Sequence, residues 1–359
     1  MTHSSWPGST LTAAVIGGGL GGRLSLDALV ASDRYVLIGI ADVNAEVRAA
    51  LADRYPGIPT FESHEQLLRS ASPDVICVST HPHSHEEVAL AAVAASPRGM
   101  LVEKPLGPTS ATGARIIDAI RGAGIPVVVP HGLVVQATAR QVIERVRDGE
   151  IGKLEIVEIR SSGWDIINAG IHWLHLCIEL LAPDRLVTVM ARCDTSTRTY
   201  RDGSQVETVA VTYLESGHGV RIVMVTGDQV DMPDGGALAH FKLVGTRGVI
   251  DFHGFQEGYR LRSYDHQDGS QVEVAPASGT GHRLHLDGLA DQIRMATLDY
   301  SLAERSLEAL EACEAAYLSN RLGCLVRLPI GSFAPPPSND WDPGARYSGS
   351  GGGRNGRNI

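Results

Sequence analysis

Cysteine is scarce in this chain, and long apolar runs are missing from it. Five cysteines among 359 residues form no C-x-x-C pair, which argues against a cysteine-based zinc site and fits a reducing compartment. No apolar run approaches the roughly 20 residues that span a bilayer, and the first residues lack the positive charge and apolar stretch of a secretion signal. We therefore expect a cytoplasmic protein with no membrane partner. The cysteines are Cys77, Cys177, Cys193, Cys313 and Cys324.

An excess of positive charge is missing too. Asp and Glu number 41 against 31 Lys and Arg, so the formal net charge is -10 at pH 7. Such a chain offers no basic surface for nucleic acid or an anionic membrane, and a small molecule is the expected partner. With 43% hydrophobic and 20% charged residues, the composition is that of an ordinary globular protein. The length exceeds one ordinary core and indicates two domains.

Residues 11–132 alternate short apolar runs with helical stretches, an order typical of a parallel sheet with helices on both faces. The apolar runs are almost continuous in Val, Ile and Leu, so we expect strands that are buried on both sides. The expected strands cover residues 12–18, 36–42, 74–80, 99–105 and 126–132. This region is predicted to be an α/β domain with a doubly wound parallel sheet, which binds its ligand at the carboxyl ends of the strands.

Residues 133–333 have a different pattern, in which strand candidates follow one another through short polar or glycine-containing loops. This pattern favours an α+β domain with a large, mainly antiparallel sheet. We expect a flexible N-terminus over residues 1–10 and, from its Pro, Gly and Ser content, a disordered tail over residues 334–359. The expected strands are 153–160, 185–192, 206–214, 219–227, 239–245, 248–252 and 259–263, and the expected helices are 135–148, 171–181 and 302–320.

The first expected strand runs into a glycine-rich turn that satisfies G-x-G-x-x-G through Gly17, Gly19 and Gly22. Such a turn lets the backbone approach a pyrophosphate, and the helix that follows from Leu20 points its free N–H groups at that anion. A tight strand-to-helix turn without a ligand is the alternative. Because the motif lies near the N-terminus between an apolar strand and a helix, we favour dinucleotide binding by Gly17, Gly19, Leu20 and Gly22.

Asp42 ends the second expected strand, where a carboxylate meets the ribose hydroxyls of a dinucleotide. A carboxylate repels a 2′-phosphate, so NAD is favoured over NADP as the cofactor. Val43 and Asn44 supply no positive charge for that phosphate, although Arg48 lies one helical turn further on. The alternative interpretation of Asp42 is a helix-capping side chain.

Glu103, Lys104 and Pro105 close the fourth expected strand and resemble the E-K-P motif of the glucose-fructose oxidoreductase and inositol dehydrogenase family (Gfo/Idh/MocA). Three further segments agree with family patterns in the same order. Residues 80–85 are similar to its T-P-x-x-x-H segment, residues 148–153 to its D-G-x-I-G-x segment, and residues 170–172 to its G-x-H. The resemblance covers roughly residues 12–330.

The resemblance implies a Rossmann domain followed by an α+β domain whose open sheet often serves in assembly. A homodimer or homotetramer is therefore expected. It also implies that Thr80, Pro82 and His85 help to bind the cofactor, and that Glu103 and Pro105 shape the nicotinamide-ribose pocket.

Lys104 is the expected main acid–base group, because the resemblance brings it to the oxygen of the reacting carbon. Removing a hydride from an alcohol leaves a hydroxyl proton, which a base must accept. A partly buried lysine near a positively charged nicotinamide is pushed toward its neutral form and can take that proton. An isolated Glu-Lys pair at a strand end is usually a solvated surface feature, but the motif around Lys104 favours catalysis.

His172 is the second catalytic candidate, since the corresponding histidine of the family shares acid–base work and substrate binding. A structural histidine near a helix start is the alternative. Two neighbours depart from the family pattern: Asn168 stands where the family typically has Asp, and His175 stands where Asp is common. Asn168 is kept as a catalytic candidate that orients His172. We expect the substrate pocket to differ from the family more than the chemistry does.

Side chains in the segments that should rim the cleft are expected to contact the substrate. They are Lys104, His131, Gln136, Trp164, Asp165, Asn168, His172 and His175. A zinc site is an alternative use of the histidines at positions 81, 83, 85, 131, 172 and 175, because imidazole is a good zinc ligand. No carboxylate pair joins them at a recognised ligand spacing, so no metal is expected.

The leading hypothesis is an NAD-dependent dehydrogenase that acts on a hydroxyl or carbonyl carbon of a sugar, a sugar derivative or a cyclitol. A glycosidase, epimerase or lyase that keeps NAD bound and oxidises its substrate only transiently is the second. A non-catalytic nucleotide-binding regulator is the third: Asn168 makes it conceivable, while Lys104 and His172 argue against it. Release of NADH during turnover separates the first two hypotheses.

Overall fold

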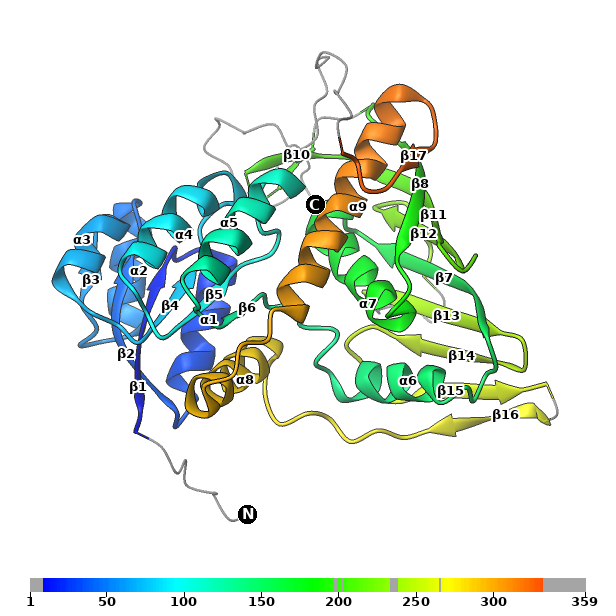
Figure 1. Cartoon of the computed structure of the whole chain (residues 1–359), viewed down its shortest axis with the longest axis horizontal. Helices are drawn as coiled ribbons and strands as arrows, with labels where there is room; N and C mark the ends of the chain where they lie inside the picture. The colour runs from blue at the N-terminus through cyan, green and yellow to red at the C-terminus, as the bar shows by residue number, and fades with distance from the viewer. Residues whose placement is uncertain (1–8, 197–198, 202, 233–237, 265, 332–359) are drawn as a thin grey trace. The chain divides into compact units, whose positions relative to one another are not determined.

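The computed structural model describes residues 9–196, 199–201, 203–232, 238–264 and 266–331 (Figure 1). The expected disordered tail and all but the last two residues of the expected flexible N-terminus lie outside the described residues. The chain divides into two compact units. Met1–Gly132 with Ser278–Leu307 forms the first unit, and Leu133–Ala277 with Glu308–Ile359 forms the second.

The first unit is built on a parallel sheet of six described strands in the order β3-β2-β1-β4-β5-β6. All five expected strands of this region are present, together with the short β3, which the sequence pattern did not predict. The order reverses between β1 and β4, as a doubly wound sheet requires. The strands are β1 (Leu11–Ile16), β2 (Tyr35–Ala41), β3 (Thr60–Phe61), β4 (Val75–Val78), β5 (Gly99–Val102) and β6 (Val127–Val128).

Helices alternate with these strands, as the residue pattern predicted (Figure 1). Polar side chains cap the N-termini of several of these helices by accepting hydrogen bonds from free backbone N–H groups of the first turn. Asn44 does so for α2, Ser63 for α3 and Thr109 for α5. The helices are α1 (Leu20–Val30), α2 (Ala45–Arg54), α3 (His64–Ser70), a 3₁₀ turn (Pro82–Ser84), α4 (His85–Ala94) and α5 (Ser110–Gly122).

Helix α8 (Gly281–Met295) also belongs to the first unit. The sequence pattern placed all of residues 133–333 in the second domain and predicted no helix here, and the structure differs on both points. Its buried face carries Leu286, Leu289 and Ala290, which join the core around β1 and β2. The hydroxyl of Tyr35 also donates to the backbone oxygen of Leu286. The apolar face of α8 thus covers a sheet whose strands lie about 150 to 280 positions earlier in the chain.

The second unit holds a sheet of nine described strands in the order β16-β15-β14-β13-β7-β12-β11-β8-β17. Only the β12–β7 pair is parallel, so the expected mainly antiparallel sheet is confirmed. Strands β9, β10, β16 and β17 were not predicted. The strands are β7 (Leu154–Ser162), β8 (Leu186–Cys193), β9 (Thr199–Arg201), β10 (Ser204–Val206), β11 (Val209–Ser216), β12 (Arg221–Gly227), β13 (Ala239–Gly245), β14 (Gly248–His253), β15 (Tyr259–Ser263), β16 (His266–Val272) and β17 (Val326–Arg327).

Helices α6 (Ala137–Arg147) and α7 (Ile171–Leu181) coincide closely with two expected helices. A π-helical turn (Ile166–Gly170) leads directly into α7. The third expected helix is α9 (Ser301–Leu322), which begins in the first unit and ends in the second. On α7, the fully buried Trp173 meets the rings of Phe241 and Phe255 edge-on at centroid distances of 5.6 and 5.9 Å. Burying a side chain of this size stabilises the fold by about 2 to 3 kcal/mol.

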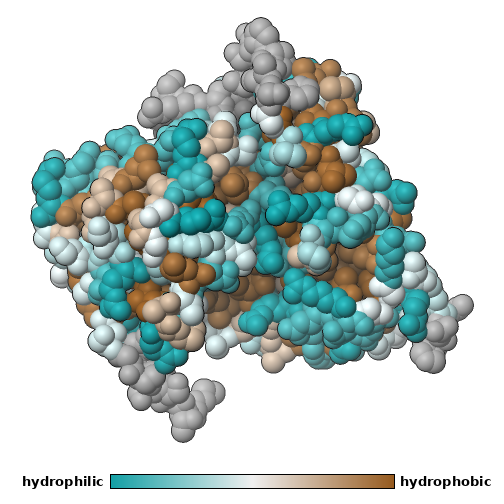
Figure 2. All heavy atoms as spheres, in the orientation of Figure 1, coloured by the Kyte–Doolittle hydropathy of each residue, from teal (hydrophilic) through white to brown (hydrophobic). Residues whose placement is uncertain are grey.

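Helix α6 shows how burial follows the helical period. Val142, Ile143 and Val146 are buried, whereas Arg140 and Glu144 are exposed. Figure 2 shows the outer side of this helix as a mainly hydrophilic strip. Such a one-sided distribution is what a helix on the surface of a sheet requires.

Candidate active site

The glycine-rich turn joins β1 to α1 and leaves no room for side chains at two positions. Gly17 has a φ of +101°, and a Cβ there would lie 2.3 Å from the backbone oxygen of Ser79. A Cβ at Gly22 would lie 1.9 Å from the backbone oxygen of Gly17. Gly19 precedes α1 and has nothing within 4 Å of its missing Cβ. The turn is therefore closed toward the protein and open beside the helix N-terminus, where an anion is favoured.

Asp42 follows β2 and is hydrogen-bonded to the glycine-rich turn. Its Oδ2 accepts a hydrogen bond from the Gly18 N–H at 2.7 Å, and its Oδ1 accepts one from the Asn44 N–H at 2.8 Å. Asn44, not Asp42, caps α2. The guanidinium of Arg48 donates to the backbone oxygens of Asp42 and Val43 at 2.9 and 3.1 Å. The carboxylate is thus held at the carboxyl end of its strand, as the nucleotide hypothesis requires.

The segment after β4 is fixed by His85, which is fully buried at the start of α4. Its Nε2 lies 2.8 Å from the backbone oxygen of Thr80, so this nitrogen carries the donated proton. Burial lowers the pKa of His85, against the opposing effect of that hydrogen bond. Pro82, which lies between Thr80 and His85 in the sequence, is buried, and Thr80 is half-buried. The hydrogen bond from His85 therefore fixes the loop after β4 and keeps Thr80 near the end of that strand.

The E-K-P segment follows β5, next to β4 in the sheet. Glu103 is 5% exposed, and its Oε1 lies 2.6 Å from Nε2 of His282, while its Oε2 accepts from the Lys104 N–H at 3.3 Å. Burial works to raise the pKa of Glu103, but the charge and hydrogen bond of His282, aided by Lys104 and His85, hold that pKa below its ordinary value. Lys104 itself is half-buried and Pro105 is buried. No pattern in the sequence predicted His282 as a partner of Glu103.

His131 is fully buried in the first unit, just before the chain enters the second. Its Nε2 lies 2.8 Å from the hydroxyl of Ser306, and its backbone oxygen accepts from Nε2 of His285 at 3.1 Å. Burial lowers the pKa of His285 to about 4, so this histidine is neutral at pH 7. His131 was expected to contact the substrate, and the structure places its side chain in this buried network.

In the second unit, Asp165 and Asn168 lie together at the π-helical turn before α7. The Asp165 Oδ1 accepts from the backbone N–H of Asn168 at 2.8 Å and from its side-chain amide at 2.9 Å. The other oxygen, Oδ2, pairs with the buried guanidinium of Arg201. That guanidinium also stacks over the ring of Trp164, 4.6 Å from its centroid. Three expected substrate contacts are therefore linked. Asp165 binds Asn168 directly, and Arg201, which was not predicted as a site residue, joins Asp165 to Trp164.

Glu207 is a second carboxyl buried beneath the same turn, and the sequence did not indicate it. It accepts hydrogen bonds from the Ile166 N–H at 2.7 Å and from the hydroxyl of Tyr317 at 2.9 Å. Burial, followed by the negative charge of Asp165, raises the pKa of Glu207 to about 7. The turn that leads to His172 is thus hydrogen-bonded to two buried acids, Asp165 and Glu207, and Asp165 is paired with one buried base, Arg201.

The other expected substrate contacts occupy separate positions in the second unit. His172 is half-buried in the first turn of α7, with its ring 6.2 Å from that of Trp173. His175, one turn further on, is fully buried. Gln136 is half-buried and precedes α6 as its N-cap residue. No hydrogen bond joins Gln136 to the Asp165 group among the bonds of the described residues.

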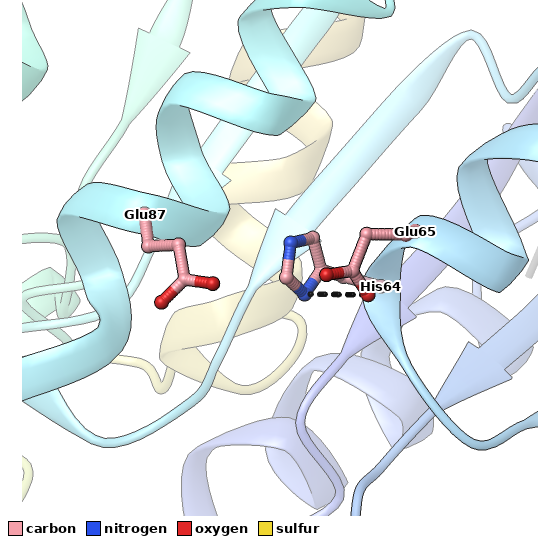
Figure 3. A group of neighbouring side chains, drawn as sticks. All are labelled: His64, Glu65 and Glu87. Carbon is pink, nitrogen blue, oxygen red and sulfur yellow. Dashed lines mark ion pairs between the residues drawn. The ribbon is translucent and has the colours of Figure 1, made fainter.

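Figure 3 shows a different group of possible metal ligands, His64 and Glu65 on α3 with Glu87 on α4. One ligand atom from each lies within 4.8 Å of the others, and His64 Nδ1 is 3.5 Å from Glu65 Oε2. Both carboxylates are exposed. None of the six histidines considered in the sequence belongs to this group. Exposed acidic residues commonly gather without an ion, so we assign it no function.

A parallel sheet, a glycine-rich turn at the first helix and a carboxylate at the end of β2 together define a dinucleotide-binding fold. Residues 11–131 match the family model described as "Oxidoreductase family, NAD-binding Rossmann fold". This match, which covers the first unit only up to residue 131, agrees with the resemblance to the Gfo/Idh/MocA family deduced from the E-K-P motif. Among the described residues, none of the helices has both the length and the apolar character needed to cross a membrane.

Curated relatives include two inositol 2-dehydrogenases. The one from Acidiphilium cryptum is 29% identical over 194 residues, which are 51% of this chain and 56% of that protein. The one from Paracoccus denitrificans is 34% identical over 119 residues, which are 32% of this chain and 34% of that protein. The chain therefore spans about half the length, or less, of the curated relatives it matches.

Solved structures agree with the fold over most of the chain. An oxidoreductase from Agrobacterium radiobacter, in complex with NAD+, L-tartaric acid and magnesium, has a TM-score of 0.74 at 19% identity and covers 89% of this chain and 98% of its own. A levoglucosan dehydrogenase, in complex with NADH and levoglucosan, has a TM-score of 0.76 at 17% identity and covers 89% of this chain and 100% of its own. At such identities the likeness establishes the fold alone.

Proposed function

We propose that this chain is an NAD-dependent oxidoreductase that moves a hydride between nicotinamide and a hydroxyl or carbonyl carbon of a sugar, a sugar derivative or a cyclitol. The observation that carries the proposal is the strand end after β5. There the buried, ionised Glu103 and the half-buried Lys104 follow a strand only two places from β1, whose end is the glycine-rich turn. Ligands of doubly wound sheets bind at the carboxyl ends of neighbouring strands.

The residues of the turn fit a dinucleotide. Open space at Gly19 and the N–H groups of the first turn of α1 suit a pyrophosphate, and Gly17 and Gly22 keep the backbone close. Thr80, Pro82, Glu103 and Pro105 are proposed to complete the cofactor pocket, with His85 supporting Thr80. When bound, NAD supplies the acceptor for the hydride.

Lys104 is proposed to accept the hydroxyl proton in the oxidative direction and to return it in the reductive one. A positioned acid–base group of this kind accelerates a reaction by roughly two to four powers of ten. His172 is proposed to assist by holding the substrate. Asn168 is proposed to support His172 as a neutral amide whose NH₂ group is engaged by Asp165. His131, Gln136, Trp164, Asp165 and His175 remain proposed substrate-pocket residues.

NAD is proposed over NADP because of Asp42. A carboxylate at the end of the second strand accepts the ribose hydroxyls of NAD in such folds, and it would repel the negative charge of a 2′-phosphate. Arg48, the nearest following arginine, already donates to the backbone oxygens of Asp42 and Val43, and its Nη2 is 3.8 Å from a Glu62 oxygen. A phosphate would have to draw the guanidinium away from these partners.

The test is a panel of polyols, sugars and cyclitols, with inositols first because of the named relatives, followed by NADH absorbance. Mass spectrometry of the purified protein shows whether cofactor is retained. Net NADH formation with at least one substrate supports the proposal. Retained NAD with turnover but no NADH release indicates transient oxidation instead, and nucleotide binding without turnover indicates a regulator. We also propose a homodimer or homotetramer, which mass photometry tests.

A further inference from the structure

The start of helix α8 is fixed by an unusually close backbone approach. A Cβ on Gly281 would lie 2.6 Å from the Cα of Gly132, so neither backbone leaves room for a side chain at Gly281. Thr280 caps the helix by accepting a hydrogen bond from the Arg283 N–H at 3.3 Å. These contacts set the position of the next residue, His282, which is 9% exposed.

His282 meets the candidate active site through Glu103. The two side chains are joined by a 2.6 Å contact between Nε2 and Oε1, and both are buried. Because Glu103 is ionised, its oxygens can only accept, and Nε2 of His282 must be the donor. The charge and the hydrogen bond of His282 both lower the pKa of Glu103. Charge-assisted hydrogen bonds of this kind are about twice as strong as neutral ones.

Glu103 in turn touches the other parts of the site. Its Oε2 accepts from the Lys104 N–H, and its carboxyl carbon would lie 2.9 Å from a Cβ on Gly21, in the first turn of α1. The carboxylate therefore lies between the glycine-rich turn and the proposed base. An uncompensated negative charge here would face the same helix N-terminus that is expected to receive a pyrophosphate.

We propose that His282 is a positioning residue of the active site, which fixes the Glu103 carboxylate and offsets its charge beside the glycine-rich turn and Lys104. The inference rests on the proposed function. The other titratable groups around Glu103 are Lys104, His85 and Cys77 in the sheet region and His285 on α8. His85 and His285 are buried with lowered pKa values, so His282 is the histidine placed to supply the counter-charge.

The experiment uses the full chain with two substitutions of graded effect. His282→Gln keeps a donor for Glu103 and removes the charge, whereas His282→Ala removes both. His285→Gln is the matched control, since it makes the same chemical change one turn further along the same helix. The carboxyl carbon of Glu103 is followed against pH by ¹³C NMR without cofactor, and NAD binding is measured by calorimetry.

We expect the pKa of Glu103 to rise in His282→Gln and further in His282→Ala, because burial is then less opposed. NAD affinity should fall roughly tenfold in His282→Ala, which loses the charge-assisted hydrogen bond to Glu103, and by less in His282→Gln, which keeps a donor, while His285→Gln leaves both readouts near the wild-type values. An unmoved Glu103 pKa, or equal NAD affinity in all forms, overturns the positioning role alone. Failure of the unmodified protein to bind NAD overturns the proposed function and this role with it.

Discussion

Each unit of this protein buries a glutamate beside a residue proposed to act on the substrate, and the two glutamates behave in opposite ways. Glu103 precedes Lys104 in the first unit, and Glu207 supports the turn before His172 in the second. They are 5% and 3% exposed, so burial alone does not distinguish them. The pKa of Glu103 lies below its ordinary value, whereas that of Glu207 is raised to about 7.

The difference lies in the charges of the partners. Glu103 faces the imidazole of His282, with Lys104 next to it. Among the described residues, the donors to Glu207 are uncharged: the Ile166 N–H, its own backbone N–H and the Tyr317 hydroxyl. The cation of the second group, Arg201, pairs with Asp165, whose negative charge further raises the pKa of Glu207. Of these two buried acids, the one beside a positive charge therefore has the lowered pKa.

The largest expected effect comes from removing the base in the first unit. Lys104→Met should lower turnover by roughly two to four powers of ten while NAD still binds, because a positioned proton acceptor is lost. Steady-state kinetics and calorimetry on the same preparation separate the two effects. Lys153→Met, on an exposed lysine, is the control. Retention of more than about a tenth of wild-type turnover, with chemistry limiting the rate, would exclude Lys104 as the main base.

Arg201→Leu removes the guanidinium that pairs with the buried Asp165. We expect it to lower the free energy of unfolding by about 3 to 5 kcal/mol at pH 8, because Asp165 is left buried without its paired cation. Lowering the pH should recover part of this loss, because Glu207, whose pKa is about 7, takes up a proton and no longer repels the neighbouring carboxylate. Urea unfolding at pH 5 and pH 8 measures both effects. Arg160→Leu, on an exposed position of β7, should cost far less, and an equal cost would refute the assigned role.

Glu207→Gln should change how stability depends on pH. The folded-state pKa of about 7 exceeds the ordinary 4.5, so between these values the native state binds more protons than the unfolded state. Stability conferred by this group is therefore present below pH 4.5 and lost as the pH rises through 7. The variant should flatten that decline and be more stable than wild type at pH 8. Thermal unfolding from pH 4.5 to pH 8 tests this, with the exposed Glu158→Gln as a control; unchanged slopes would contradict it.

The smallest expected effect belongs to a carboxylate that is not fully buried. Asp42→Ala should weaken NAD binding by about tenfold and narrow the difference between NAD and NADP, because the ribose loses an acceptor and a 2′-phosphate loses a repelling charge. Calorimetry with both nucleotides is the measurement. Tighter binding of NADP than of NAD by the unmodified protein would rule out the NAD preference.

The parts of this architecture that were predicted from sequence have local causes. Short apolar runs such as residues 75–78, rich in Val and Ile, favour buried strands, and Gly17 and Gly22 follow from steric needs within one turn. The missed strand β16 and helix α8 had weaker local patterns, although Thr280 ahead of an apolar series ending at Ile293 was a usable sign of a helix.

The partners of the buried acids could not be predicted because they come from distant positions. His282 is 179 residues from Glu103, and Tyr317 is 110 residues from Glu207. Neither pairing can be recognised from a regular spacing of residues in the sequence. Asn168 was noted as a departure from the family pattern, but only the structure shows that Asp165 engages its amide.

The return of residues 278–307 to the first unit bears on how the protein can be divided. A fragment ending at Gly132 would contain every residue that matches the NAD-binding family model, and would look complete by that measure. It would nevertheless expose the core positions that Leu286 and Leu289 cover, and Glu103 would lose His282. We expect such a fragment to aggregate, whereas one that joins residues 9–132 to residues 278–307 through a flexible linker keeps the nucleotide-binding unit whole.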